Sequence, residues 1–495
     1  MIAALIASAV LAVAVGPGGS SARSLSPRAL GTPAPGAFAS PAGDWLTFDL
    51  NAQRANGWPT AAGITAADLH RLRRLTIHID GTVDSAAVAL HNLVIAGRPR
   101  DVFFVTTTYG RTLAIDAANG RVLWRYTPAS LHRLQGSGQV TTASPVIDPS
   151  LQYIYTTSPD GFVHKLAITS GRVVWSTRVT WDPTREKLAG GLNIDGGSLV
   201  VPTDGYYGDA PSYQGHVVTI DLLSGRITHV WNSLCSNIRT LIHPPSRCGS
   251  SDSAIWGRPG TVILPGSGDI LVSTGNGPFN GRTNWGDSVL ELSPTLRLLH
   301  NWTPANQQQL NQTDHDLGST EPALLPVAGG PPLAVQGGKD GILRLLDLAR
   351  LDGTAGPAGP RTGGELQRIK APGPTDVYSQ PAVARLGSRI YVFVTDGAGT
   401  AAYVLRGRRL RMAWENSRPG TSPVLADGLL FSYDEQDGLL LVLNPRSGRV
   451  ERTLPAAPGH WNSPIVFDGH IVLPEGSYFT HSSGGTIDIY QRPGA

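Results

Sequence analysis

The apolar residues of this chain come in short alternating runs that end in tight turns. The clearest copies, at residues 113–124, 166–175 and 218–231, pass through Asn-Gly-Arg or Ser-Gly-Arg and end in tryptophan. Residues 441–450 repeat the turn, and weaker copies end at Trp302 and Trp414. Alternation with a period of two is typical of β-strands, and glycine supplies the positive φ of a hairpin turn. The pattern therefore predicts antiparallel strands joined by hairpins.

A second repeat marks the beginning of each unit: a polar or charged residue, then proline, then an apolar strand. Clear copies begin at Ser144, Arg258, Glu321, Gln380, Ser422 and Ser463, and degenerate copies begin at Ser85 and Gly197. Spacings of about forty to sixty residues fit one four-stranded sheet per unit. The eight units predict an all-β fold, an eight-bladed β-propeller of four-stranded antiparallel blades.

The two ends of the repeat region are expected to meet. After Ser463 the chain has room for three strands only, whereas residues 72–80 form an extra strand before the first unit. An N-terminal strand that completes the last blade would remove the open sheet edge. Sustained helical periodicity is absent from the sequence beyond a turn or two at residues 66–72.

Composition agrees with a globular β protein and argues against a nucleic-acid partner. The chain is 41% hydrophobic and 16% charged, with 59 glycines and 38 prolines, which is far from the composition of a disordered chain. The formal net charge is +3, and no run of Lys or Arg is interleaved with aromatic residues. We therefore expect no nucleic acid to bind.

The first residues look like a targeting segment. Residues 2–15 are apolar and small, and they are followed by Gly-Pro-Gly-Gly and a stretch rich in Ala, Ser and Pro. We interpret 1–22 as a signal peptide, 23–43 as a linker and 44–495 as the propeller, with no membrane span in the mature chain. A membrane anchor is the alternative, although the apolar run is shorter than the ~20 residues that a span requires. The protein is thus expected to be secreted or periplasmic.

The two cysteines, Cys235 and Cys248, lie in one segment. In an oxidising compartment such a pair predicts a disulfide that closes a loop. A metal site is the weaker interpretation, because His243 is the only other metal-ligand type between them.

The tryptophan-ended repeats resemble the pyrroloquinoline quinone (PQQ) repeat of the quinoprotein alcohol dehydrogenase-like propellers, over about residues 44–490. Trp256, in Ile-Trp-Gly, resembles the tryptophan that lies under the quinone in that family. Asn276, in Ser-Thr-Gly-Asn-Gly-Pro-Phe, resembles the asparagine that binds calcium. The resemblance implies PQQ and Ca²⁺ as cofactors.

Two further segments extend the resemblance. Asp316, in Asp-His-Asp-Leu, resembles the catalytic aspartate, and Lys339, in Gly-Lys-Asp-Gly, resembles the basic residue that touches the quinone oxygens. Asp204 or Asp209 stands, by position only, where the family has a calcium-binding glutamate. The chemistry is consistent, because a flat quinone needs an aromatic platform and its oxygens need a hard cation and a positive donor.

The sequence also departs from the family. The aspartate stretch is shortened, so Asp316 is catalytic in a shifted alignment or the catalytic residue is missing. The adjacent Cys-Cys pair that covers the quinone in many members is absent, and no Cys-x-x-Cys-His predicts a covalently bound c-type haem. Each site residue also has a structural interpretation, as a loop filler for Trp256 and as a turn or capping residue for the others.

Two main functions remain open from the sequence. The first is a secreted, calcium- and quinone-dependent dehydrogenase of alcohols or polyols, with a small-molecule alcohol as its partner. The alternative is a non-catalytic propeller scaffold or binding module for a cell-envelope polymer or protein. A lyase or hydrolase that uses Asp and His on the same face is a third option, but no Gly-x-Ser-x-Gly or His-Glu-x-x-His pattern supports it.

Overall fold

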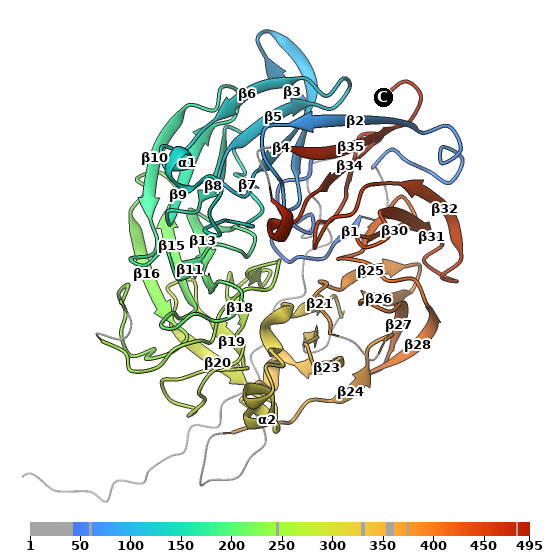
Figure 1. Ribbon diagram of the computed structural model, residues 1–495. Coiled ribbons are helices and arrows are strands. Elements are labelled where there is room, and N and C mark those ends of the chain that lie inside the picture. The colour runs from blue at the N-terminus through green and yellow to red at the C-terminus, as the bar shows by residue number, and fades with distance from the viewer. Residues whose placement is uncertain are drawn as a thin grey trace, which may run out of the picture.

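The eight repeat units form a ring of sheets around a central axis (Figure 1). The structure is a computed structural model that describes residues 43–58, 62–243, 247–327, 332–352, 361–373, 376–481 and 484–495. The predicted all-β, eight-bladed propeller of four-stranded antiparallel blades is confirmed. The predicted signal peptide, and the linker up to residue 42, lie outside the described residues.

Blades 1 to 4 follow one another along the chain, each with its innermost strand first. Their strands are β3 (Val88–Ile95), β4 (Arg98–Thr106), β5 (Thr112–Asp116) and β6 (Val122–Tyr126); β7 (Val146–Ile147), β8 (Tyr153–Ser158), β9 (Phe162–Ala167) and β10 (Val173–Arg178); β12 (Asn193–Asp195), β13 (Ser198–Pro202), β15 (His216–Asp221) and β16 (Ile227–Asn232); and β17 (Val262–Ile263), β18 (Ile270–Ser273), β19 (Val289–Leu292) and β20 (Leu298–Trp302).

Blades 5 to 8 continue the ring. Their strands are β21 (Ala323–Leu325), β22 (Leu333–Gln336), β23 (Ile342–Asp347) and β24 (Gln367–Lys370); β25 (Ala382–Leu386), β26 (Arg389–Thr395), β27 (Thr400–Arg406) and β28 (Arg409–Asn416); β29 (Val424–Ala426), β30 (Leu429–Asp434), β31 (Leu439–Leu443) and β32 (Val450–Pro455); and β33 (Ile465–Phe467), β34 (His470–Glu475), β35 (Gly485–Gln491) and β2 (Arg73–Ile79).

Several short elements lie outside the four-stranded blades. They are the strands β1 (Gly57–Trp58), β11 (Glu186–Lys187) and β14 (Asp204–Gly205), the helices α1 (Leu131–Leu134) and α2 (Gln307–Gln312), and the 3₁₀ helices η1 (Leu317–Ser319), η2 (Leu348–Arg350) and η3 (Tyr478–Thr480). None of the helices in the described part of the chain is long and apolar enough to span a membrane.

The last blade combines strands from both ends of the chain. β2 pairs with β35 antiparallel along its whole length, from Arg73 opposite Gln491 to Ile79 opposite Gly485. It is therefore the outermost strand of the sheet whose other strands follow Ser463. Strands β2 and β35, far apart in the sequence, lie side by side in Figure 1.

The repeated tryptophans join neighbouring blades. Trp124 donates its indole N–H to the carbonyl of Ile168 in blade 2, at 2.8 Å, and its ring packs against the turn glycine Gly171. A Cβ on Gly171, where φ is +68°, would lie 2.5 Å from that ring. Trp414 and Gly448 repeat the contact between blades 6 and 7. The Gly and Trp of the sequence repeat are thus two sides of one contact, and apolar clusters fill the space between adjacent blades.

The segment that precedes the first blade runs inside the ring. Its backbone carbonyls accept hydrogen bonds from innermost strands: Leu46 from Ile147, Ala52 from Ile263, and Asn56 from Leu425. Trp45 also bridges to the innermost strand of blade 1, and the fully buried side chain of Arg54 donates to Thr261 and to Leu192. Residues 44–58 therefore hold blades 1, 2, 3, 4 and 7 together from within.

Cys235 and Cys248 form a disulfide with a Cα–Cα distance of 6.0 Å, as predicted. The backbone N–H of Cys235 also donates a hydrogen bond to Asn284 Oδ1, at 3.0 Å. The bridge closes the loop between β16 and the segment that leads into blade 4.

Candidate functional site

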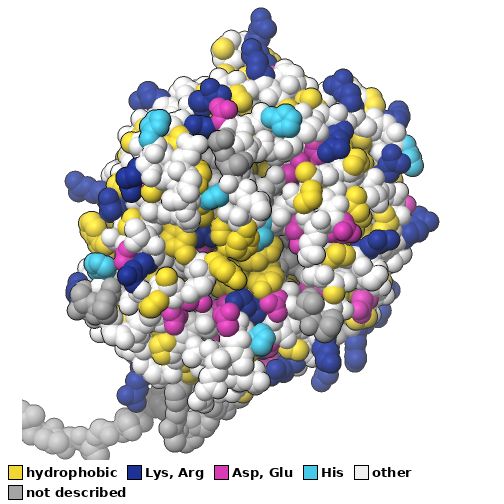
Figure 2. Space-filling model, in the orientation of Figure 1, with side chains coloured by type: hydrophobic (Ala, Val, Ile, Leu, Met, Phe, Trp, Pro, Cys, Tyr) yellow, Lys and Arg dark blue, Asp and Glu magenta, His cyan; other side chains and the backbone are white. Residues whose placement is uncertain are grey.

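A cavity of about 450 Å³ opens at the axis of the ring. Of the residues predicted from the sequence, Trp256, Asn276, Asp316, Lys339 and Asp209 all line it. Figure 2 shows hydrophobic side chains gathered at the centre of this face, with acidic side chains beside them. Among the described residues the lining also includes Thr142, Lys187, Tyr206, Tyr207, Tyr213, Arg258, Asp314, Tyr378, Trp461, Tyr478 and Phe479.

The blade repeat itself places the aromatic wall of the cavity. Trp256, Tyr378 and Trp461 each stand two residues before the polar-Pro pair that begins a blade. This position is where the chain enters an innermost strand, so its side chain faces the axis. The Tyr378 and Trp461 rings stack with centroids 4.6 Å apart, and the Trp256 and Trp461 rings stack at 5.9 Å with an angle of 29°. The sequence pointed to Trp256 and missed the other two.

Asp316 lies at the floor of the cavity between Lys339 and Asn276. Its Oδ2 is 2.5 Å from the Lys339 ammonium, and its Oδ1 accepts the backbone N–H of Asn276 at 2.6 Å. The Lys339 ammonium also stands 5.3 Å from the centroid of the Trp256 ring. Blades 4 and 5 thus bring the four residues together, although they are up to 83 positions apart (339 minus 256).

Gly275 makes this close approach possible. A Cβ at this position would lie 2.3 Å from Asp316 Oδ1 and 3.1 Å from the Trp256 indole nitrogen. Any side chain here would displace the carboxylate or the ring. The Thr-Gly-Asn segment therefore supplies space as well as the Asn276 backbone donor.

Burial and charge set the protonation of this pair. Burial raises the pKa of Asp316, and the ammonium of Lys339 opposes that rise. Burial lowers the pKa of Lys339, but the carboxylates of Asp316 and Asp314 outweigh it and raise that pKa overall. Lys339 is therefore a permanent cation beside Asp316, and the carboxyl titrates above its usual range.

Oxygen donors gather on the side of Asn276. Asp209 lines the cavity and accepts the Tyr213 hydroxyl at 2.6 Å. Burial raises the pKa of Asp252, and the nearby negative charges of Asp209 and Asp316 raise it further. Sequence reasoning missed Asp252, which sits in the Ser-rich stretch before Trp256. Its φ of 85° is rare for a residue other than glycine, and such backbone strain tends to cluster at functional sites.

Asp204 is not among the residues that line the cavity. It pairs in register with Lys187 through β11 and β14, and it is 3% exposed. Burial raises its pKa to about 7, against the opposing charge of Lys187. One of its oxygens, Oδ1, has no hydrogen-bond partner among the described residues. The Lys187 side chain itself does line the cavity.

A buried ion network supports the opposite wall. The Arg258 guanidinium is 2.6 Å from Asp84, whose other oxygen is 2.9 Å from His460 Nδ1. The His460 ring stacks on Trp461 with centroids 4.1 Å apart. Although burial alone would raise the pKa of Asp84, Arg258 and His460 together hold it below its usual value. Arg258 and Asp84 thus fix the position of Trp461 through His460.

A second cavity, of about 470 Å³, adjoins the first. Tyr378 and Trp461 line both, so their stacked rings form the partition between them. The second cavity carries carboxylates from Asp376, Asp396 and Glu435. Burial raises the pKa of Glu435 to about 7.

Comparison with known families agrees with the repeat. The PQQ_2 family model, described as outer membrane protein assembly factor BamB, matches residues 78–229. A polyvinylalcohol dehydrogenase from Pseudomonas sp. is 23% identical over 385 residues, which is 72% of this chain. The chain spans 57% of the length of that relative.

Solved structures share the whole ring. A quinohemoprotein alcohol dehydrogenase from Comamonas testosteroni has a TM-score of 0.67 at 14% identity, over 92% of this chain and 81% of its own. Quinohemoprotein alcohol dehydrogenase ADHIIG from Pseudomonas putida HK5 has a TM-score of 0.69 at 13% identity, over 94% and 83%. The chain has the fold of the PQQ-type β-propellers. A europium-containing methanol dehydrogenase shares the fold too, with a TM-score of 0.67 at 15% identity over 92% and 99%.

The cavity of this PQQ-type propeller suits the cofactor that its repeat is named after. Its volume is within the range of about 300–1,000 Å³ for small-molecule sites. Lys187, Arg258 and Lys339 supply positive charge for the carboxylate groups of the quinone, and Trp256 supplies a flat aromatic face. Asn276 and Asp209 provide oxygen ligands of the kind that calcium takes.

One dimension of the cavity is narrow for a flat ring. Two faces that sandwich an aromatic ring stand about 7 Å apart, twice the carbon contact distance of about 3.5 Å. The Trp256 and Trp461 centroids are 5.9 Å apart. Because the two rings already stack at an angle of 29°, a flat ring would fit between them only if Trp461 moved away from Trp256.

Proposed function

We propose that the protein is a secreted dehydrogenase of alcohols or polyols that uses PQQ and calcium. The observation that carries this proposal is the buried carboxylate of Asp316, held by Lys339 and by the Asn276 backbone directly beside the Trp256 platform. A carboxylate fixed next to an aromatic face and a permanent cation suits removal of the hydroxyl proton of an alcohol while a quinone bound on that face would take the hydride. The disulfide supports an oxidising, extracytoplasmic compartment.

The residues that would hold the cofactors are those of the cavity wall. Trp256 would lie under the quinone, and Trp461 would face it from the other side. Lys339 and Arg258 would pair with its oxygens, and Asn276 with Asp209 would bind calcium. When bound, the quinone would supply a hydride acceptor, and calcium would supply a Lewis acid beside it.

The chain itself handles the proton. Asp316, ionised beside Lys339, accepts the hydroxyl proton of the alcohol as the hydride leaves carbon, so the alcohol loses two electrons and two hydrogens in all. The Asn276 N–H keeps Oδ1 in place, and Lys339 keeps the carboxylate charged. Tyr207 and Phe479, whose rings meet edge to face at 5.5 Å, lie at the mouth and limit water around the reacting groups.

The second cavity favours substrates with more than one hydroxyl group. A polyol bound at Asp316 would pass the Tyr378 and Trp461 partition into a space lined by three carboxylates. Carboxylates accept hydrogen bonds from hydroxyls, and aromatic faces pack on the C–H faces of such chains. Polyols are therefore expected to bind better than simple alcohols of equal charge.

Reconstitution tests this function directly. Purified protein is titrated with PQQ in the presence of calcium, and the quenching of tryptophan fluorescence is followed. We expect saturable binding at micromolar quinone and reduction of a dye acceptor when a polyol is added. Trp256→Ala should weaken quinone binding at least about tenfold, because a stacked aromatic contact and its buried area are lost.

The matched control is Trp181→Ala, which removes an exposed tryptophan that is not among the residues lining the cavity. This variant should bind the quinone as the unchanged protein does. Binding without turnover would point to the alternative, a propeller that acts as a binding module. If the folded protein binds no quinone at all, the proposed cofactor is wrong.

A further inference from the structure

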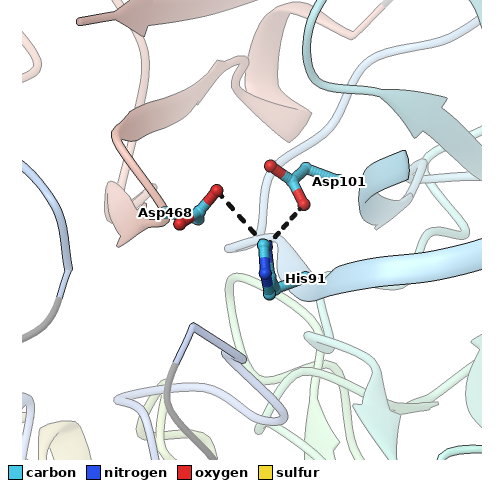
Figure 3. Close-up of side chains that lie close together, drawn as sticks. All are labelled: His91, Asp101 and Asp468. Atoms are coloured by element: carbon cyan, nitrogen blue, oxygen red, sulfur yellow. Dashed lines mark hydrogen bonds and ion pairs between the residues drawn. The ribbon is translucent and has the colours of Figure 1, made fainter. Parts of the chain in front are cut away.

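A separate cluster of polar side chains lies at the junction of blades 1 and 8. His91 and Asp101 belong to the β3–β4 hairpin of blade 1, and Asp468 lies in the turn between β33 and β34 of blade 8. Figure 3 shows the imidazole of His91 facing both carboxylates. None of the three is among the residues that line the two cavities described above.

The ligand atoms of this cluster have the spacing that a small metal ion requires. His91 Nδ1 is 2.8 Å from Asp101 Oδ1 and 3.3 Å from Asp468 Oδ2. One such atom from each residue lies within 4.8 Å of the other two. Tetrahedral zinc, with bonds of about 2.0–2.1 Å to nitrogen and oxygen, places neighbouring ligand atoms about 3.3 Å apart. The three side chains therefore need only small shifts to coordinate one ion.

Carboxylates lie around His91, and the Arg492 side chain lies against Gly469, next to Asp468. In the part of the chain that the structure describes, His91 is the ion-pair partner of both Asp101 and Asp468. Asp44 adds a third carboxylate, because its Oδ1 accepts the backbone N–H of His91 at 2.8 Å. Arg100, on the same strand as Asp101, pairs instead with Asp116. Three carboxylates around one imidazole favour a bound cation.

A second imidazole lies beside the cluster with one nitrogen unused. His470 is 1% exposed, and its Nε2 has no hydrogen-bond partner among the described residues. Its Nδ1 is 3.1 Å from the Asp468 carbonyl, and the ring is close enough to interact electrostatically with Asp101 and Asp468. A buried polar nitrogen without a partner is costly unless another group, such as a metal ion, uses it.

We propose that His91, Asp101 and Asp468 form a binding site for one divalent transition-metal ion of the zinc type. Imidazole nitrogen and carboxylate oxygen are the ligands that such ions take, and water would fill the fourth position. The ligands come from the first and the last blade, so a bound ion joins these two blades to each other. The site is independent of the quinone and calcium assigned to the central cavity.

The test uses the full chain without a histidine tag, freed of metal with EDTA and then dialysed. Calorimetric titration with zinc, in millimolar calcium so that the oxygen ligands of the central cavity are occupied, should give one equivalent bound with a micromolar or lower Kd. The thermal unfolding midpoint should rise on zinc addition, because an ion that binds the folded state stabilises it. Asp468→Asn should weaken zinc binding at least about tenfold and remove most of the rise in Tm.

Two variants keep the result interpretable. Asparagine tolerates the φ of 37° at position 468, so Asp468→Asn is expected to fold normally. His300→Ala removes a histidine that pairs at 3.3 Å with a single carboxylate, that of Asp352, and should bind zinc as the unchanged protein does. The proposal is overturned if the unchanged protein binds no zinc at sub-millimolar concentration, or if Asp468→Asn and His91→Ala bind it equally well.

Discussion

Asp316 and Lys339 define the chemistry of the cavity at the scale of single residues. The carboxyl is buried, which raises its pKa, and the ammonium 2.5 Å away limits that rise. A proton acceptor must be ionised before it can work, so the pair sets the lowest pH at which alcohol can be oxidised. Lys339 and Asp316 together therefore determine the pH below which the activity falls, which is the acidic limb of the pH profile.

Lys339→Met should shift that limb to higher pH. Without the ammonium, burial alone acts on Asp316, so its pKa rises further and a higher pH is needed to ionise it. We expect a shift of about one pH unit or more in the profile of kcat/KM for polyol oxidation. Lys339→Arg keeps the charge and should leave the limb near its original place. An unmoved limb in Lys339→Met would show that Asp316 is not the base.

The sequence predicted part of this site and missed the rest for a definable reason. Trp256, Asn276, Asp316 and Lys339 were found because each stands in a short motif, and their convergence follows from the repeat. Trp461 carries no such motif, yet it occupies the same place before Ser463-Pro as Trp256 does before Arg258-Pro. Aligning that position across all blades would have found Trp461 and Tyr378. Nothing local marks Lys187 or Asp252, whose roles depend on which side chains the fold brings beside them.

At the scale of elements, the blade repeat was readable because hairpin turns and blade contacts use the same few residues. Gly171 must be glycine both for its φ of +68° and for the Trp124 ring against it, so the two recur together. The eight blades and the pairing partner of β2 followed from counting these units. The path of residues 44–58 could not be predicted in this way. Hydrogen bonds between backbone carbonyls and backbone N–H groups leave no side-chain pattern in the sequence.

The disulfide loop gives a prediction at this scale. Cys235 and Cys248 are 13 positions apart, and closing a loop of this size stabilises the folded state by about 3 kcal/mol in the chain-entropy model. The double variant Cys235→Ser with Cys248→Ser should lose about 2–3 kcal/mol in the free energy of unfolding, measured with urea. Mass analysis of unreduced peptides from the unchanged protein should find the two cysteines joined. Unreduced protein with two free thiols would contradict the bridge.

At the scale of the whole molecule, several buried carboxyls make stability depend on pH. Burial raises the pKa of Glu186 and of Asp204 to about 7 and that of Glu475 to about 8. A carboxyl whose pKa is higher in the folded state holds its proton there while the unfolded chain has lost it. Its stabilising contribution is complete below about pH 4 and disappears as the pH rises through the folded pKa.

The free energy of unfolding, measured by urea titration, should therefore be lower at pH 8 than at pH 5.5. Glu186 alone, with a pKa of about 7 against 4.5 in the unfolded chain, accounts for about 2 kcal/mol of that fall. Glu186→Gln cannot lose a proton and should flatten the dependence by about this amount. His164 and His216, whose pKa burial lowers to about 4, act in the opposite direction, so the difference between Glu186→Gln and the unchanged protein is the test. An equal pH dependence of the two proteins would mean that Glu186 is ionised in the folded state.

The strand-like segment inside the ring also constrains the order of events during folding. Residues 44–58 leave the ribosome before any blade, yet Asn56 donates to the carbonyl of Pro423, 367 positions later. The groups that bind this segment are not all in place until blade 7 has been synthesised and has folded. Contacts of such long sequence separation slow folding, because chain entropy is lost before they form. Residues 44–58, which precede every blade in the sequence, are thus among the last to pack, and a truncated or stalled chain cannot complete the ring.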